Sequence, residues 1–86
     1  MKTVLLDGDG DRGEILRRLA THLGVAPVAN LDALWDVLRT DARGPFEIVW
    51  RQSARARDAL GEDFARIDEI FRRLVAERHD VRVTFI

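Results

Sequence analysis

Residues 8–13 match the G-x-G-x-x-G pattern of a dinucleotide-binding turn, and Asp32 follows about twenty residues further on, where a ribose-binding acid is expected. A pyrophosphate requires an uncluttered, electropositive helix start. Here Asp7, Asp9 and Asp11 crowd the turn with negative charge, and the chain is too short for two mononucleotide-binding halves. We therefore interpret the segment as a glycine-rich turn whose aspartates cap and complement the helix that follows.

The alternating aspartates also resemble the start of an EF-hand calcium loop, which requires glycine at its sixth position and glutamate at its twelfth. Counted from Asp7, these positions hold Arg12 and Arg18, so the pattern fails at both. The chain has no cysteine, which excludes disulfides, thiol catalysis and cysteine-ligated metal. We therefore expect neither a bound metal nor any other cofactor.

The two histidines and the one serine do not form a catalytic group. His22 and His79 each lie near the predicted C-terminus of a helix, where an imidazolium suits the helix dipole, and no pattern brings them together. Ser53 is explained as the N-cap of a short helix. Because no pattern brings a nucleophile, a base and an orienting group together, we expect that the chain is not an enzyme and has no small-molecule substrate.

Two carboxylates in the first half of the chain are not explained by local stability alone. Asp32 and Asp36 are four residues apart in a helical pattern, so they share one face beside the apolar stripe. Like charges at this spacing cost about 0.2–0.5 kcal/mol in an isolated helix. The helix dipole offsets this cost at Asp32, in the first turn, but has faded at Asp36. Asp36 is therefore either half of a surface ion pair with Arg39 or a functional group.

The hydrophobic pattern that must position these carboxylates alternates single strands with pairs of helices. Apolar residues recur with a period of two in the strands and at i, i+3, i+4 and i+7 in the helices. Strands are predicted at residues 3–6, 46–50 and 81–86, and helices at residues 12–23, 31–39, 54–60 and 63–78. Asp11 and Asn30 are predicted N-caps, since their side chains can accept hydrogen bonds from the first helical turn. Gly24 and Gly61 are predicted to end the helices that precede them.

The order β-α-α-β-α-α-β predicts an α/β fold with a three-stranded parallel sheet covered by about four helices. About 39 residues separate the first two strands and about 30 the last two, and such long helical connections favour parallel pairing with right-handed crossovers. The order of the strands within the sheet stays open. With 86 residues, the chain is predicted to form one domain over residues 1–86.

Composition and charge restrict the class of partner. The chain is 47 % hydrophobic and 34 % charged, which is typical of a globular protein rather than a disordered one. Fourteen basic residues against fifteen acidic ones argue against a nucleic-acid partner, because such binding requires a basic excess. The first apolar run is too short for a signal peptide and no other run could cross a bilayer, so we expect a cytoplasmic protein with no membrane partner.

The segment N-L-D-A-L-W-D at residues 30–36 resembles a segment of the barstar family, the intracellular inhibitors of bacterial guanyl-specific ribonucleases. The resemblance continues at residues 45–52, where V-W-R-Q is similar to the end of the family's second strand, and again at residues 71–86. Order, spacing and length fit from end to end. The resemblance implies the barstar fold and an inhibitor, acting as an antitoxin or immunity protein, with no chemistry of its own.

In this family the second helix and the loop before it enter the active-site cleft of the ribonuclease. Carried over by the resemblance, Asp36 would meet the cationic phosphate-binding site and Asp32 a second part of the active site, in a one-to-one complex. The other contact residues that the resemblance implies are Val28, Asn30, Leu31, Ala33, Trp35, Arg39 and Arg73. The implied mechanism is physically sound, because a carboxylate on a rigid helix can replace phosphate in charge-assisted hydrogen bonds to arginine or lysine.

The chain also departs from the family pattern. The loop at residues 24–29 is about two residues shorter and lacks the tyrosines of that pattern. Arg73 stands where an acidic contact residue is expected, and Asp41 stands where a tryptophan is expected. These differences leave the carboxylate pair intact, but they change residues that would determine which partner is bound. They motivate an alternative, in which the chain is a protein-binding module of the same fold for a different toxin or nuclease.

Overall fold

Three parallel strands, β1 (Lys2–Leu6), β2 (Phe46–Trp50) and β3 (Val81–Phe85), form one sheet in the order β1-β2-β3. The computed structural model describes residues 1–86. Across the sheet, Val4 pairs with Ile48, and Ile48 pairs with Val83. The predicted α/β class and parallel pairing are confirmed. The strand order, which the pattern left open, follows the order in the chain.

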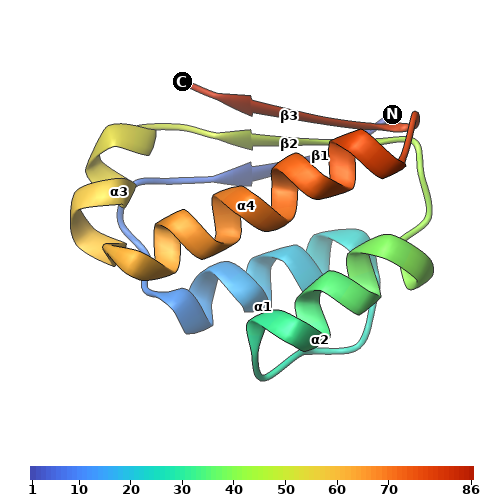
Figure 1. Ribbon diagram of the computed structural model, residues 1–86, viewed down its shortest axis with the longest axis horizontal. Coiled ribbons are helices and arrows are strands. Elements are labelled where there is room, and N and C mark those ends of the chain that lie inside the picture. The colour runs from blue at the N-terminus through green and yellow to red at the C-terminus, as the bar shows by residue number, and fades with distance from the viewer.

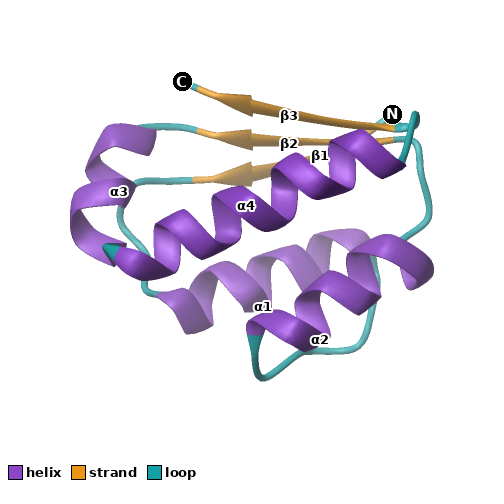
Figure 2. Cartoon of the chain, viewed as in Figure 1, coloured by secondary structure: helices purple, strands orange, loops and turns teal.

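The strands are connected by α1 (Arg12–Leu23), α2 (Leu31–Asp36), the π-helix η1 (Val37–Asp41), α3 (Ser53–Leu60) and α4 (Glu62–Glu77). Both connections step in the same direction across the sheet, so right-handed crossovers place their helices on the same face. Figure 1 shows α1, α2 and α4 gathered on one side of the strands. Figure 2 shows α3 beyond the end toward which all three strands point. None of these helices has both the length and the apolar character needed to cross a membrane.

The core lies between the sheet and the helices. Phe46, Ile48 and Trp50 of β2 are fully buried, because alternate residues of a strand point to the same side. Glu47 and Val49 lie between them, face the uncovered side of the sheet and are partly exposed. The helices contribute Ile15, Leu16, Leu19 and Leu23 from α1 and Phe64, Ile67, Phe71 and Leu74 from α4.

The helix ends that depend on local chemistry are confirmed. The side chain of Asp11 accepts a hydrogen bond from the backbone N–H of Glu14 at 2.8 Å and so caps α1. Gly24, with a φ of 70°, ends the same helix in the left-handed conformation that favours glycine. Apart from the second helix, all boundaries agree with the predictions to within one residue.

Ser53 does not act as the N-cap of α3, so that prediction is wrong. It is the first residue of the helix, and Gln52 precedes it without a side-chain cap. The backbone N–H and the hydroxyl of Ser53 both donate to the carbonyl oxygen of Ile86, at 3.0 and 3.2 Å. Because the residue after β3 supplies this acceptor, Ser53 ties α3 to the sheet instead of capping its own helix.

The prediction of one regular helix over residues 31–39 is also corrected. α2 ends at Asp36, and the chain continues as the π-helix η1. The backbone N–H of Ala42 donates to the carbonyl of Val37, five residues earlier, at 2.9 Å. The hydroxyl of Thr40 also donates to the carbonyl oxygen of Asp36 at 2.7 Å, so a side chain of η1 bonds back to the end of α2.

Arg78, which follows α4, holds this wider turn in place. Its guanidinium donates to the carbonyl oxygens of Leu38 and Ala42, both at 2.8 Å. It also donates to both carboxylate oxygens of Asp80, at 3.0 and 2.8 Å, and lies over the ring of Phe46. The Arg78 side chain is only 16 % exposed. One partly buried cation therefore joins η1 to the junction between α4 and β3.

Asp80 should make the stability of the fold depend on acidic pH. The hydrogen bond from Arg78, the largest cause, lowers the pKa of Asp80 below its usual value of 3.8. A lowered pKa stabilises the folded state above the ordinary carboxyl pKa, and this contribution is lost as the pH falls through the folded value. We expect thermal unfolding of the wild type to lose more stability below about pH 4 than unfolding of Asp80→Asn. Parallel pH profiles for the two proteins would contradict this prediction.

Candidate functional site

α2 presents two carboxylates to solvent. Asp32 and Asp36 are both exposed, whereas Leu34 between them is buried. Neither carboxylate forms an ion pair with a cation of the chain. Asp36 and Arg39 in particular do not pair, so a surface ion pair does not account for Asp36. Two carboxylates about one helical turn apart are thus free to bind a cationic group from outside.

Capping and core contacts hold the helix that carries these carboxylates. The side chain of Asn30 accepts a hydrogen bond from the backbone N–H of Ala33 at 2.8 Å, which confirms the predicted N-cap. Leu34 and, in η1, Leu38 are buried in the core, and Leu31 packs against it. Because these leucines occupy the inner face of the helix, the two carboxylates lie on its outer side.

Replacing Asn30 by alanine should lower the free energy of unfolding by about 1 kcal/mol, as loss of an N-cap does. Asp11→Ala, which removes the cap of α1, should cost a similar amount, and urea denaturation of both variants measures this. Only Asn30 caps the helix that carries the carboxylates, so only Asn30→Ala should also weaken the binding of a partner at α2. Equal effects of the two variants on partner binding would contradict this positioning role.

A cation–aromatic contact joins α2 to α4. The guanidinium carbon of Arg73 lies 4.6 Å from the centre of the Trp35 ring. Trp35 is partly buried and packs against the core, whereas Arg73 is exposed and forms no ion pair. The resemblance pointed to both residues as contacts for a partner. Only the tertiary structure shows that they also contact each other.

The other residues singled out by the resemblance lie around the carboxylates. Leu31 and Ala33 are partly buried on α2, and Val28 is partly buried in the loop before it. Arg39 is exposed on η1. All the residues singled out therefore come from α2 and the segments beside it, except Arg73, which reaches the same surface from α4.

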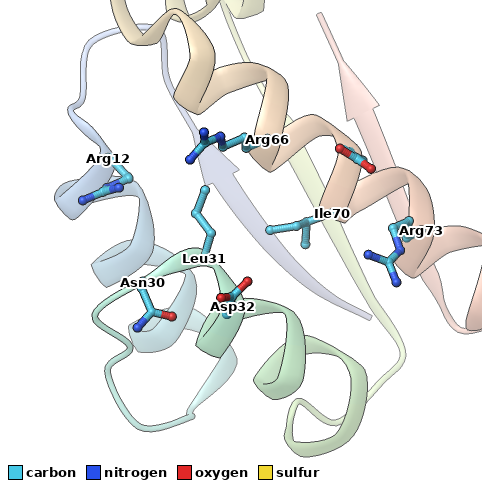
Figure 3. Close-up of a pocket in the computed structure, with 8 residues that line it drawn as sticks. Arg12, Asn30, Leu31, Asp32, Arg66, Ile70 and Arg73 are labelled. Carbon is cyan, nitrogen blue, oxygen red and sulfur yellow. The ribbon is translucent and has the colours of Figure 1, made fainter.

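A shallow cavity of about 420 Å³ lies between the start of α2 and the middle of α4 (Figure 3). The predicted residues on its wall are Asn30, Leu31, Asp32 and Arg73. The residues that sequence reasoning missed are Arg12 of α1 and Arg66, Glu69 and Ile70 of α4. The α4 residues of the wall follow an i, i+3, i+4, i+7 spacing, which identifies one face of a helix. That signal is present in the sequence, but it does not show what the face lies against.

The glycine-rich turn is neutralised by its own ion pairs. A carboxylate oxygen of Asp7 lies 2.9 Å from a guanidinium nitrogen of Arg51, and the other lies 3.8 Å from Arg18. A carboxylate oxygen of Asp9 lies 2.9 Å from Arg55. These aspartates brace the turn against α1 and the segment after β2, which agrees with the interpretation of the turn as structural.

The fold and the site together define a class of protein. A small α/β domain displays, on a capped and core-anchored helix, two free carboxylates beside a partly exposed aromatic ring. Charged groups around an aromatic anchor on a rigid element are typical of surfaces that bind another protein.

Residues 1–86, the whole chain, match the family model of barstar, described as the barnase inhibitor. The chain belongs to the barstar family, and the resemblance seen in the sequence is confirmed. Proteins of this family are ribonuclease inhibitors rather than enzymes. No curated protein matches the sequence.

Proposed function

We propose that this protein inhibits a bacterial guanyl-specific ribonuclease by inserting α2 into its active-site cleft. The observation that supports the proposal is that Asp32 and Asp36 are exposed and unpaired. Both carboxylates are exposed, they lie on one helix about a turn apart, and no cation of the chain neutralises either. Family membership supports the same kind of partner.

The mechanism is mimicry of the RNA backbone. A ribonuclease cleft is electropositive, because it must bind phosphates and stabilise a negatively charged transition state. Asp36 is the principal anchor and takes the place of a phosphate through charge-assisted hydrogen bonds to arginine or lysine of the enzyme. Asp32 binds a second part of the same site, and the body of α2 blocks the entry of substrate.

The residues around the pair exclude water from these contacts. Trp35 supplies an aromatic surface, and Leu31 and Ala33 supply small apolar contacts beside the carboxylates. Because Asn30 and the core contacts fix α2 before the partner arrives, little conformational freedom is lost on binding. Val28 and Arg39 lie at the edges of this surface.

The inhibitor acts one-to-one in the cytoplasm of a bacterium, as an antitoxin or immunity protein against a ribonuclease that would otherwise degrade the cell's own RNA. Binding requires no cofactor, nucleic acid, membrane or small molecule. Opposite charges on inhibitor and enzyme accelerate their encounter, so association slows as salt is added.

Titration of barnase with the protein, followed by cleavage of a fluorescent RNA, tests the proposal. We expect activity to fall linearly to a break at one equivalent, with an association rate that decreases between low and physiological salt. Failure to inhibit barnase and a panel of other guanyl-specific ribonucleases at micromolar concentrations would contradict it. Specific binding to a different nuclease, without ribonuclease inhibition, would instead support a barstar-like module for another partner.

A further inference from the structure

Three arginines line the cavity beside the carboxylate helix. Arg12 comes from the start of α1, and Arg66 and Arg73 come from one face of α4 (Figure 3). Asp32 lines the same cavity, so a protein that binds Asp32 lies next to these arginines. A cationic surface therefore lies directly beside the acidic one.

These arginines are poorly neutralised within the chain. Arg66 and Arg73 form no ion pair, and Arg12 reaches only Asp63, at 3.9 Å. The guanidinium carbon of Arg73 lies over the Trp35 ring, and neither Arg73 nor Arg66 donates a side-chain hydrogen bond within the chain. Exposed Arg66 and Arg73 therefore offer several unused N–H donors to the space between α2 and α4.

We infer that the cavity receives an aspartate or glutamate side chain from the rim of the inhibited ribonuclease, bound by Arg66 and Arg73. This inference rests on the proposed function and limits the set of ribonucleases that can be bound. The partner carries an acidic side chain beside the cationic group that binds Asp32. The inhibitor thereby selects ribonucleases with this pair of opposite charges.

The lining of the cavity favours a single carboxylate over a phosphate-rich ligand. Asp32 and Glu69 stand on the same wall as the arginines and would repel a polyanion such as a nucleotide. The apolar side chains of Leu31 and Ile70 lie between the charged groups and suit the methylene groups of a glutamate or aspartate. One carboxylate matches the planar donor fork of an arginine without adding further charge.

The same arrangement rejects the wrong enzyme. A ribonuclease with a basic residue at this place would put a cation against two unpaired arginines, and like charges across an interface weaken binding. The acidic helix suits any cationic ribonuclease cleft. The arginines of α4 then determine which of these ribonucleases are bound tightly.

The test compares a double charge reversal in the cavity with a matched reversal elsewhere. Arg66→Glu/Arg73→Glu is measured beside Arg17→Glu/Arg82→Glu, which makes the same change in net charge at exposed positions on α1 and on β3. Inhibition constants are determined for barnase and a panel of guanyl-specific ribonucleases. For the enzyme that the wild type inhibits most tightly, we expect the cavity variant to be weaker by about tenfold or more, and the control by about twofold at most.

The single variant Arg66→Glu separates charge from packing, because Arg66 makes no ion pair or hydrogen bond of its own that could be lost. Arg66→Glu alone should still weaken inhibition severalfold. Substituting an arginine for the facing acidic residue of the ribonuclease should restore inhibition by this variant. Inhibition by the cavity variant that equals or exceeds that of the control would overturn the inference alone. Absence of inhibition by the wild type would overturn the proposed function and the inference with it.

Discussion

Asp36→Ala should weaken inhibition of the target ribonuclease by roughly 30-fold to several thousand-fold, mainly through faster dissociation. Truncating one partner of a buried, hydrogen-bonded charge pair costs about 2–5 kcal/mol, because the cations of the enzyme are left desolvated and unpaired. Asp36 has no partner within its own chain, so nothing else is lost when the carboxylate is removed. The measurement is the inhibition constant, together with association and dissociation rates from surface plasmon resonance.

The stability of Asp36→Ala should stay within about 0.5 kcal/mol of the wild type, since an exposed, unpaired surface residue contributes little to folding. Removal of the repulsion from Asp32 could only assist the helix. Asp58→Ala is the matched control, because Asp58 is an exposed and unpaired aspartate on α3. Indistinguishable inhibition constants for these two variants would remove Asp36 from the mechanism.

Arg78→Ala should lower the free energy of unfolding by about 2–4 kcal/mol, because it removes charge-assisted hydrogen bonds to two partly buried carbonyl oxygens as well as the pairing with exposed Asp80. The substitution leaves the carbonyl oxygens of Leu38 and Ala42 without their donor and Asp80 without its cation. Arg78→Lys should recover only part of the loss, because a single ammonium cannot reproduce the planar donor fork that reaches all three groups. Urea denaturation with coincident fluorescence and circular dichroism transitions measures the effect.

Arg72→Ala is the matched control for this prediction. Arg72 also pairs with an aspartate, Asp68 at 3.1 Å, but its side chain is 76 % exposed, so its loss should cost less than about 0.5 kcal/mol. Arg78→Ala should also weaken inhibition. Arg78 binds one carbonyl within η1, at Leu38, and one directly after it, at Ala42, and η1 is the direct continuation of α2. A stability loss no larger than that of Arg72→Ala would show that this junction does not depend on Arg78.

The features predicted correctly from sequence are those settled by neighbours in the chain. The caps at Asp11 and Asn30 each use a backbone N–H three residues later, so residue type and spacing suffice. The strands and the long helices follow the periodicity of their apolar residues for the same reason. The carboxylate pair belongs to this group too, because a spacing of four places two side chains on one helix face wherever the helix lies.

The wrong predictions concern residues whose partners are far away in the chain. The position of Ser53 at a helix start predicts an N-cap, but its hydroxyl instead donates to the carbonyl oxygen of Ile86, 33 residues later in the chain. The second helix was expected to stay regular, but it gives way to η1, where Arg78 holds a carbonyl from 40 residues away. No local pattern contains these partners, since the fold must form before they meet.

The α/β class, the family and the two acidic groups on one helix face therefore follow from the amino-acid sequence, because each depends on residue type and short-range spacing. The strand order, the π-helical end of the carboxylate helix and the absence of a pair between Asp36 and Arg39 became visible only in the folded chain. The set of residues that line the cavity between α2 and α4, Arg12, Arg66 and Arg73 among them, was equally hidden from the sequence. These contacts depend on how the helices pack against the sheet, and packing is a property of the whole chain rather than of any one segment.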